Sequence, residues 1–287
     1  MIFVFLSCAL GGVVGLLALS KLWHWITSGH CTSTRRMDGK IVIVTGANSG
    51  KRPNVHVLPL DLTSLASVRR FVQLVKQQTS KLHVLVNNAG CISLPHELTK
   101  DGMQLEMQTN HFGPFLLTLL LLDLLKKSAP SRVLMVSSEA YMFAKLRMDD
   151  LNCERYLPGD WTLYSNTKLA NILCSNELAR RLHGTGVTCN SLHPGVVRTE
   201  VFRTVSPSWF RAILNFVYGF GFKNAEQGAQ TSIYLSVAEE VEHVTGKYFT
   251  DCKETSTSKK ARDENSARML WEESLRLVKL REEEVAL

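Results

Sequence analysis

The chain has 287 residues, of which 45% are hydrophobic and 21% charged, with 18 glycines and 8 prolines. This composition fits one globular domain and excludes intrinsic disorder, collagen-like sequence and a disulfide-stapled miniprotein. The net charge of +7 is spread thinly along the chain, so nucleic acid is not an expected partner. The 7 cysteines are widely spaced and form no C-x-x-C pair, which predicts reduced thiols and no metal site.

The N-terminal segment is strongly apolar. Residues 1–20 contain no charged side chain and are long enough to cross about 30 Å of hydrocarbon as a helix. Basic residues follow this segment instead of preceding it, which favours an uncleaved membrane anchor over a signal peptide. Residues 21–39 then form a basic juxtamembrane linker, and residues 40–287 form the folded domain. The charge distribution places that domain in the cytosol, on a single-pass membrane protein.

From residue 41 onward, short apolar runs alternate with longer amphipathic stretches. The apolar runs predict strands at 41–46, 55–62, 82–90, 132–138, 187–195 and 246–251. The longer stretches predict helices at 64–78, 97–127, 161–184, 224–240 and 266–280. This alternation predicts an α/β fold with a doubly wound parallel sheet, in which ligands bind at the carboxyl ends of the strands.

Seven short motifs follow one another along the same stretch. In chain order they are Thr45-Gly46-Ala47-Asn48-Ser49-Gly50, Asp61-Leu62, Asn87-Asn88-Ala89-Gly90, Asn110 with Gly113, Ser137-Ser138, Tyr164 with Lys168, and Pro194-Gly195 with Thr199. Their order and spacing resemble the signature of the short-chain dehydrogenase/reductase family. The phrases NHFGPFLLT, KLANIL and ELARRL resemble, more narrowly, its membrane-anchored retinol dehydrogenase-like branch.

The resemblance implies a Rossmann-like oxidoreductase that transfers hydride between a nicotinamide cofactor and a lipophilic alcohol or carbonyl, such as a retinoid or a steroid. It implies NADP(H) as the cofactor and leaves NAD(H) open. It also implies a location in the endoplasmic reticulum membrane, and it allows a homo-oligomer paired through the helices at 97–127 and 161–184. The residues implied for cofactor binding are Thr45, Gly46, Asn48, Ser49, Gly50, Asp61, Leu62, Asn87, Asn88, Ala89, Gly90, Tyr164, Lys168, Pro194, Gly195, Val197 and Thr199.

Four residues are expected to carry the chemistry. Reduction of a carbonyl needs a proton donor and a group that polarises the carbonyl oxygen. By resemblance, Tyr164 is the acid or base and Ser138 orients the substrate, so both contact it. Lys168 lies one helical turn after the tyrosine, where its positive charge favours the phenolate and its side chain anchors the ribose. Asn110 is expected to hold a proton-relay water.

Two of these assignments have competitors. Tyr141 and Lys145 repeat the Y-x-x-x-K spacing, but no long helical pattern follows them, whereas Tyr164 opens a long helix with one apolar face. Ser137 and Ser138 lie on opposite faces of a strand end, so only one of them can point at the substrate. The spacing of the family favours Ser138.

The largest departure from the family pattern follows Gly50. The pattern requires a third glycine that opens a phosphate-binding helix, followed by a second strand whose end selects NAD or NADP. Here Gly50 is followed by Lys51-Arg52-Pro53, and only ten residues separate it from Asp61. The helix, the second strand and a further helix, roughly 35 residues, are therefore missing between Gly50 and Lys51. The alternative function is a noncatalytic membrane-anchored pseudoenzyme, or a truncated isoform with impaired cofactor binding.

Two further expectations concern exposed apolar residues. Loss of the second strand leaves the 41–46 strand with an exposed hydrophobic edge unless the 55–62 strand moves in beside it. Such a short parallel connection is sterically disfavoured. The aromatic residues between 209 and 222 predict either an apolar lid over the substrate or plain core.

Overall fold

The computed structural model describes residues 27–47, 55–197, 223–281 and Glu284. Several sequence predictions fall outside these residues: the anchor at 1–20, the aromatic stretch at 209–222, and the candidate cofactor residues Asn48, Ser49, Gly50 and Thr199. Within the described ranges, every helix is too short or too polar to span a bilayer.

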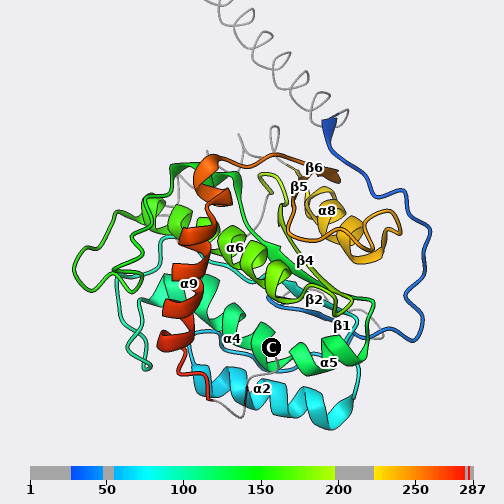
Figure 1. Cartoon of the computed structure of the whole chain (residues 1–287), viewed down its shortest axis with the longest axis horizontal. Helices are drawn as coiled ribbons and strands as arrows, with labels where there is room; N and C mark the ends of the chain where they lie inside the picture. Colours follow the sequence, from blue (N-terminus) through cyan, green and yellow to red (C-terminus); the bar gives the residue numbers. More distant parts are fainter. Residues whose placement is uncertain (1–26, 48–54, 198–222, 282–283, 285–287) are drawn as a thin grey trace, which may run out of the picture.

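One sheet forms the centre of the described chain (Figure 1). Five parallel strands lie side by side in chain order: β1 (Val42–Val44), β2 (Val84–Asn87), β3 (Ser131–Val136), β4 (Val187–His193) and β5 (Tyr248–Thr250). The short β6 (Lys253–Glu254) pairs antiparallel with β5. Successive residues of β3 belong to two different apolar clusters, Val133 to one and Leu134 to the other, so both faces of the sheet are buried. Burial on both faces explains why these strands read as continuous apolar runs.

Helices cover both faces. The first face carries α2 (Leu65–Gln78), α3 (Leu105–Met107), the π-helical turn η1 (Gln108–Phe112), α4 (Gly113–Leu120), α5 (Leu122–Lys127) and α6 (Asp160–Arg181). The second face carries α8 (Ala225–Val237). α9 (Glu264–Leu277) lies across α6 as an outer layer (Figure 1). Two 3-10 turns, η2 (Glu139–Phe143) and η4 (Lys259–Arg262), complete the described elements. The predicted α/β class, with a parallel sheet between helices, is confirmed.

β1 lies at the open edge of the sheet. It pairs with β2 in the register Val42↔Val84 and Val44↔Val86, and residues 55–62 form no strand beside it. The strand predicted at 55–62 is therefore wrong, because too few residues follow β1 to return the chain to the start of a parallel neighbour. Val42 and Val44 remain 41% and 48% exposed, which is the hydrophobic edge expected from the sequence.

The described sheet also differs from the predicted doubly wound sheet in its strand order. A doubly wound sheet reverses its strand order at the first strand, where the two halves meet. In the described chain the order runs from β1 to β6 without reversal. The described sheet is thus one half of a doubly wound arrangement, with β1 as its border.

The helix predicted at 97–127 begins later than expected. Residues 97–104 form a turn in which Leu98 and Gln104 make an isolated antiparallel bridge, and the helix opens at Leu105 with Gln104 as its N-cap. The side chain of Gln104 accepts a hydrogen bond from the backbone N–H of Met107 at 2.7 Å. The hydrogen bond from this cap fixes the first residue of the helix, although the amphipathic pattern extends further toward the N-terminus.

The C-terminal helix α9 covers the outer side of α4 and α6. The Trp271 ring meets Phe115 edge-on with centroids 4.9 Å apart, and the Arg181 guanidinium lies 4.7 Å from the Trp271 ring centroid. Trp271 is 1% exposed. The chain itself therefore occupies a surface of the two helices that the resemblance offers for pairing subunits.

Replacing the buried tryptophan of α9 is expected to destabilise the domain strongly. Trp271→Ala removes a large, fully buried ring and should lower the free energy of unfolding by about 3 to 5 kcal/mol. Urea denaturation measures this change. Met269→Ala is the matched control on the same helix, because Met269 is 54% exposed and its loss should cost less than about 0.5 kcal/mol. Equal losses in the two variants would contradict this packing.

The segment before β1 is tied to the α8 side of the domain. The Gly29 N–H donates to Asp251 Oδ1 at 3.1 Å, and the Cys31 N–H donates to Gln230 Oε1 at 3.0 Å. Arg35 forms an ion pair with Glu242. The described part of the predicted linker therefore lies against the fold.

Candidate functional site

Several of the predicted site residues follow the carboxyl ends of four strands. Thr45 and Gly46 follow β1, Asn88 follows β2, Ser138 follows β3, and Pro194 follows β4. The carboxyl ends of parallel strands meet at one edge of the sheet, which is where open α/β sheets bind ligands.

Thr45 joins the loops after β1 and β2. Its hydroxyl oxygen accepts hydrogen bonds from the backbone N–H groups of Asn88 and Ala89, each at 3.0 Å, and Asn88 Nδ2 donates to the Thr45 carbonyl at 3.0 Å. Gly46 has a φ of 82°, and a Cβ there would lie 3.0 Å from Ala89 Cα. A glycine is therefore required, both for the left-handed backbone and for the close approach of the two loops.

Gly90 faces the two polar side chains at the centre of the site. A Cβ on this glycine would lie 3.2 Å from Lys168 Nζ and 3.5 Å from Asn110 Oδ1. A larger residue would press against the ammonium group. The bare Cα leaves open the space beside Lys168, on the side of the loop after β2.

Asn110 lies in η1, a π-helical turn between α3 and α4. Such turns are rare and are frequent at functional sites. Its Oδ1 accepts from the Cys91 N–H at 2.9 Å and the Cys91 thiol at 3.4 Å. Its Nδ2 donates to the Cys91 carbonyl at 2.8 Å and to Thr167 Oγ1 at 3.2 Å. These four contacts use the full capacity of the amide, so Asn110 locks the loop after β2 to α6, and a relay water would have to bind another atom of the residue.

Tyr164 and Lys168 lie one turn apart near the start of α6. The Lys168 ammonium is 5.3 Å from the centroid of the Tyr164 ring and donates to the Val136 carbonyl at 3.3 Å. Lys168 is 4% exposed, whereas Tyr164 is half-buried. A buried cation therefore lies beside a phenol that remains accessible.

The two serines after β3 have different environments. Ser137 is buried, and its hydroxyl donates to the Lys168 carbonyl at 2.8 Å. Ser138 is half-buried and caps η2, with its oxygen accepting from the Ala140 N–H at 3.2 Å. Ser137 is thus committed to the backbone of α6, and Ser138 is the serine with an accessible hydroxyl.

The competing tyrosine is part of the packing. Tyr141 is 4% exposed, its hydroxyl accepts from the Ser258 N–H at 3.0 Å, and its ring meets Tyr248 edge-on with centroids 5.6 Å apart. Lys145 lies beyond the end of η2. The second Y-x-x-x-K therefore does not lie on one α-helix, as Tyr164 and Lys168 do.

Three predicted cofactor residues have local structural roles. Asn87 is buried, and its Nδ2 donates to Thr118 Oγ1 at 2.9 Å, which directs the side chain into the core between β2 and α4. Asp61 Oδ1 accepts from the Thr63 N–H at 2.9 Å in the turn that leads to α2. Leu62 is buried, and a Cβ on Gly113 would lie 2.6 Å from its carbonyl oxygen.

The residues after β4 are held by a buried lysine that no motif indicated. Lys223 is 6% exposed, forms an ion pair with Asp251, and donates to the Pro194 carbonyl at 3.4 Å. Gly195 has a φ of 87°, and a Cβ there would lie 2.6 Å from Lys223 Cδ. Val197 forms an isolated parallel bridge with Lys223. The Pro-Gly turn therefore depends on Lys223.

Two titratable groups beside Asn110 were also missed from the sequence. Burial raises the pKa of the Cys91 thiol to about 12 and the pKa of the Glu106 carboxyl to about 7. Glu106 is 1% exposed, and hydrogen bonds from the backbone of Leu94 and Ser93 offset only part of the cost of burying its carboxyl group. Only periodicity could have pointed to Glu106, because it is a charged residue on the buried side of a helix.

The raised pKa of Glu106 predicts a pH dependence of stability. Glu106 binds its proton more tightly in the folded chain than in the unfolded chain, where its pKa is 4.5, so stability should fall as pH rises from 4.5 to about 7. Glu106→Gln removes this cost and should stabilise the domain by roughly 2 to 3 kcal/mol more at pH 7.5 than at pH 4.5 relative to the wild type. Urea unfolding at both pH values measures the difference. If the difference in unfolding free energy between Glu106→Gln and the wild type were the same at both pH values, the raised pKa of Glu106 would be contradicted.

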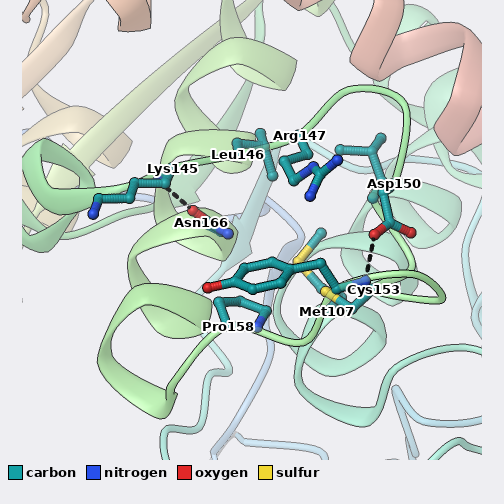
Figure 2. Close-up of a pocket in the computed structure, with 10 residues that line it drawn as sticks. Met107, Lys145, Leu146, Arg147, Asp150, Cys153, Pro158 and Asn166 are labelled. Atoms are coloured by element: carbon teal, nitrogen blue, oxygen red, sulfur yellow. Dashed lines mark hydrogen bonds between the residues drawn. The ribbon is translucent and has the colours of Figure 1, made fainter.

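A hollow on another side of α6 is separate from this site. It is lined by Met107, Lys145, Leu146, Arg147, Asp150, Leu151, Cys153, Tyr156, Pro158 and Asn166 (Figure 2). Its walls are held by local hydrogen bonds, from the Lys145 N–H to Asn166 Oδ1 at 2.7 Å and from the Cys153 N–H to the Asp150 carbonyl at 3.1 Å. The predicted catalytic residues are not among those that line it.

Comparisons with known proteins show which family the chain resembles. The sequence profile of the short chain dehydrogenase family matches residues 36–208. Human retinol dehydrogenase 14 is 48% identical over 233 residues, which cover 79% of this chain and 69% of that protein. Human retinol dehydrogenase 13 is 38% identical over 312 residues, which cover 95% of this chain and 94% of that protein.

A solved structure with the same fold is the Pseudomonas aeruginosa RhlG/NADP active-site complex. It is 26% identical, has a TM-score of 0.51, and the match covers 67% of this chain and 73% of that chain. The fold, the strand-end site and the sequence likeness lead to one conclusion. The chain belongs to the short-chain dehydrogenase/reductase family, in its retinol dehydrogenase-like branch.

Proposed function

We propose that the chain interconverts a lipophilic alcohol and its carbonyl, with a retinoid or a steroid as substrate and NADP(H) as the cofactor. The observation that carries this proposal is the Lys168 ammonium, buried 5.3 Å from the centroid of the accessible Tyr164 ring. The relationship to retinol dehydrogenases supports the substrate class, and the likeness to an NADP complex supports the cofactor.

The described residues fit the nicotinamide end of such a cofactor. Gly90 has no side chain between its Cα and the Lys168 ammonium, and Gly46 lets the loop after β1 pack closely against Ala89 in the loop after β2. A bound nicotinamide supplies or accepts the hydride. Lys168 would anchor the ribose, and the loops at Thr45, Ala89 and Pro194 are the ones that would hold the cofactor.

The proton moves through the protein's own side chains. In reduction, Tyr164 donates its hydroxyl proton to the substrate oxygen, and in oxidation it takes that proton back. Ser138 donates a hydrogen bond to the same oxygen and orients it. The Lys168 ammonium lies 5.3 Å from the centroid of the Tyr164 ring, beside the group that transfers the proton.

We also propose that the cofactor site is incomplete on its phosphate side, with a segment missing between Gly50 and Lys51. The open edge of β1 supports this, since Val42 and Val44 are exposed there. The match to human retinol dehydrogenase 13 runs over 312 positions, more than the 287 residues of this chain, so that relative carries residues without a counterpart here. Weak cofactor binding is the expected consequence.

We propose that residues 1–20 anchor the chain as a single span in the endoplasmic reticulum membrane, with the domain at 40–287 in the cytosol. The uncharged apolar run supports the anchor, and the basic residues that follow it support the orientation. The contacts of Gly29 and Cys31 with the domain imply that the linker holds the domain close to the bilayer.

The test uses the full-length chain. Calorimetric titration with NADPH should give weak binding, and NADPH oxidation in the presence of retinal should give turnover. Human retinol dehydrogenase 13 is the positive control. Absence of NADPH binding even at concentrations more than about 100-fold above those at which the control binds overturns the proposal and favours a pseudoenzyme.

A further inference from the structure

The carbonyl of Val136, the last residue of β3, accepts two hydrogen bonds from α6. One comes from Lys168 Nζ and the other from Asn171 Nδ2, each at 3.3 Å. Lys168 and Asn171 are each 4% exposed, so water does not compete freely for this oxygen. A carbonyl oxygen has two lone pairs. Asn171 donates to one of them, so the other is the position at which the Lys168 ammonium can donate.

Asn171 is held in turn by His111, the residue after Asn110 in η1. His111 Nδ1 lies 3.3 Å from Asn171 Oδ1, and His111 Nε2 lies 2.9 Å from Ser274 Oγ on α9. His111 is 1% exposed and Ser274 is fully buried. Three elements far apart in the sequence therefore meet through polar side chains within the core.

The direction of each hydrogen bond follows from the chemistry of the groups. Burial lowers the pKa of His111 to about 4, so its imidazole is neutral at pH 7 and has one donor and one acceptor. Asn171 donates through Nδ2 to Val136, so its oxygen accepts, and His111 Nδ1 carries the hydrogen. His111 Nε2 then accepts from the Ser274 hydroxyl. The hydrogen bonds therefore all run in one direction, from Ser274 to His111, from His111 to Asn171, and from Asn171 to the Val136 carbonyl.

We infer that Ser274, His111 and Asn171 form a directional hydrogen-bond chain that positions the Lys168 ammonium against Tyr164. The inference rests on the role of Lys168 in the proposed function. Ser274 on α9 then influences the position of Lys168 indirectly, through His111 and Asn171, without contacting the site itself. Asn171, His111 and Ser274 are positioning residues, since they act on the reaction through Lys168.

The first test needs no activity. Acetic anhydride is applied to the full-length chain without cofactor, and the acetylation rate of Lys168 is followed by peptide mass spectrometry. Asn171→Ala removes the second donor to the Val136 carbonyl, so the Lys168 ammonium is no longer restricted to one direction at that oxygen. Lys168 should then react about tenfold faster, a change that corresponds to one neutral hydrogen bond. Ser274→Ala, which is nearly isosteric, should raise the rate about threefold.

Two controls separate positioning from general loosening. Asn176 lies on the same helix and donates to the Ala261 carbonyl at 2.9 Å, so Asn176→Ala removes a similar contact with the C-terminal segment that does not lead to Lys168. Lys223, which is also buried, serves as the internal standard. The expected result is faster labelling of Lys168 in Asn171→Ala, and to a smaller extent in Ser274→Ala, with Lys168 unchanged in Asn176→Ala and Lys223 unchanged in every variant. Faster labelling of both lysines, or equal Lys168 rates in Asn171→Ala and Asn176→Ala, overturns the inference.

The second test uses turnover. In Asn171→Ala, kcat should fall about tenfold while KM for the substrate changes less than about twofold, because the substrate contacts Tyr164 and Ser138 instead. An unchanged kcat overturns the inference. If Asn171→Ala does not fold, Ser274→Ala carries both measurements. A wild-type chain without turnover refutes the proposed function, whereas the labelling result still decides whether the chain of contacts positions Lys168.

Discussion

Tyr164→Phe is expected to lower kcat by about 10² to 10⁴-fold while the domain stays folded. The substitution removes the hydroxyl that exchanges a proton with the substrate and keeps the ring beside Lys168. Tyr164 is half-buried, so the loss of one oxygen should change the free energy of unfolding by less than about 1 kcal/mol. Steady-state kinetics with NADPH and retinal, together with urea unfolding, measure both effects.

Tyr141→Phe is the matched control, because it changes the tyrosine of the second Y-x-x-x-K. The Tyr141 hydroxyl accepts a hydrogen bond from the Ser258 N–H, so its loss should cost about 1 kcal/mol of stability. Turnover should stay within about twofold of the wild type. If Tyr141→Phe abolished turnover and Tyr164→Phe did not, the assignment of the acid or base would be reversed.

Restoring the segment between Gly50 and Lys51 is expected to have the second large effect. The inserted residues are those of human retinol dehydrogenase 13 that have no counterpart here. A helix N-terminus contributes up to about 2 kcal/mol to a bound anion, and each hydrogen bond to a charged group adds about 1.5 to 3 kcal/mol. NADPH should therefore bind about 100-fold more tightly, or more, as measured by calorimetry.

The same insertion should stabilise the fold. A second strand paired with β1, and a helix packed on it, would cover Val42 and Val44, which are 41% and 48% exposed. Covering these two side chains should add about 1 to 2 kcal/mol, measured as a higher midpoint of urea unfolding. A Gly/Ser segment of the same length is the control, and it should raise neither the NADPH affinity nor the midpoint of urea unfolding. An insertion that left NADPH affinity unchanged would refute the idea that the phosphate side of the site is incomplete.

Much of the fold could be predicted from the sequence, since its signals are local. The buried parallel strands appear as short apolar runs, and α2, α6, α8 and α9 appear as amphipathic stretches near their observed bounds. The prediction at 55–62 failed because a strand needs a neighbour, and an apolar run carries no information about whether a partner edge can be reached. The start of the 97–127 helix failed because the cap at Gln104 decides it.

The candidate site was predicted in part. Motif spacing predicted catalytic roles for Asn110, Ser138, Tyr164 and Lys168, and these remain predictions. It also predicted cofactor roles equally for Asn87, which points into the core, and for Gly90, which faces Lys168. Lys223 was missed, because it meets Pro194 only through the fold. Residues of one motif can therefore have different environments, and only the residues around them in the folded chain show which of them face the site.

The sequence by itself determined the α/β class and the order of the strand-end loops, because these follow from local patterns. It also predicted which groups move a proton, from residue chemistry. Tertiary structure decided which serine is accessible and which tyrosine belongs to the packing. It also decided that His111 meets Ser274 across 163 residues of chain. Such contacts depend on how β3, α6 and α9 are arranged, and no periodicity encodes the distance between two residues of different elements.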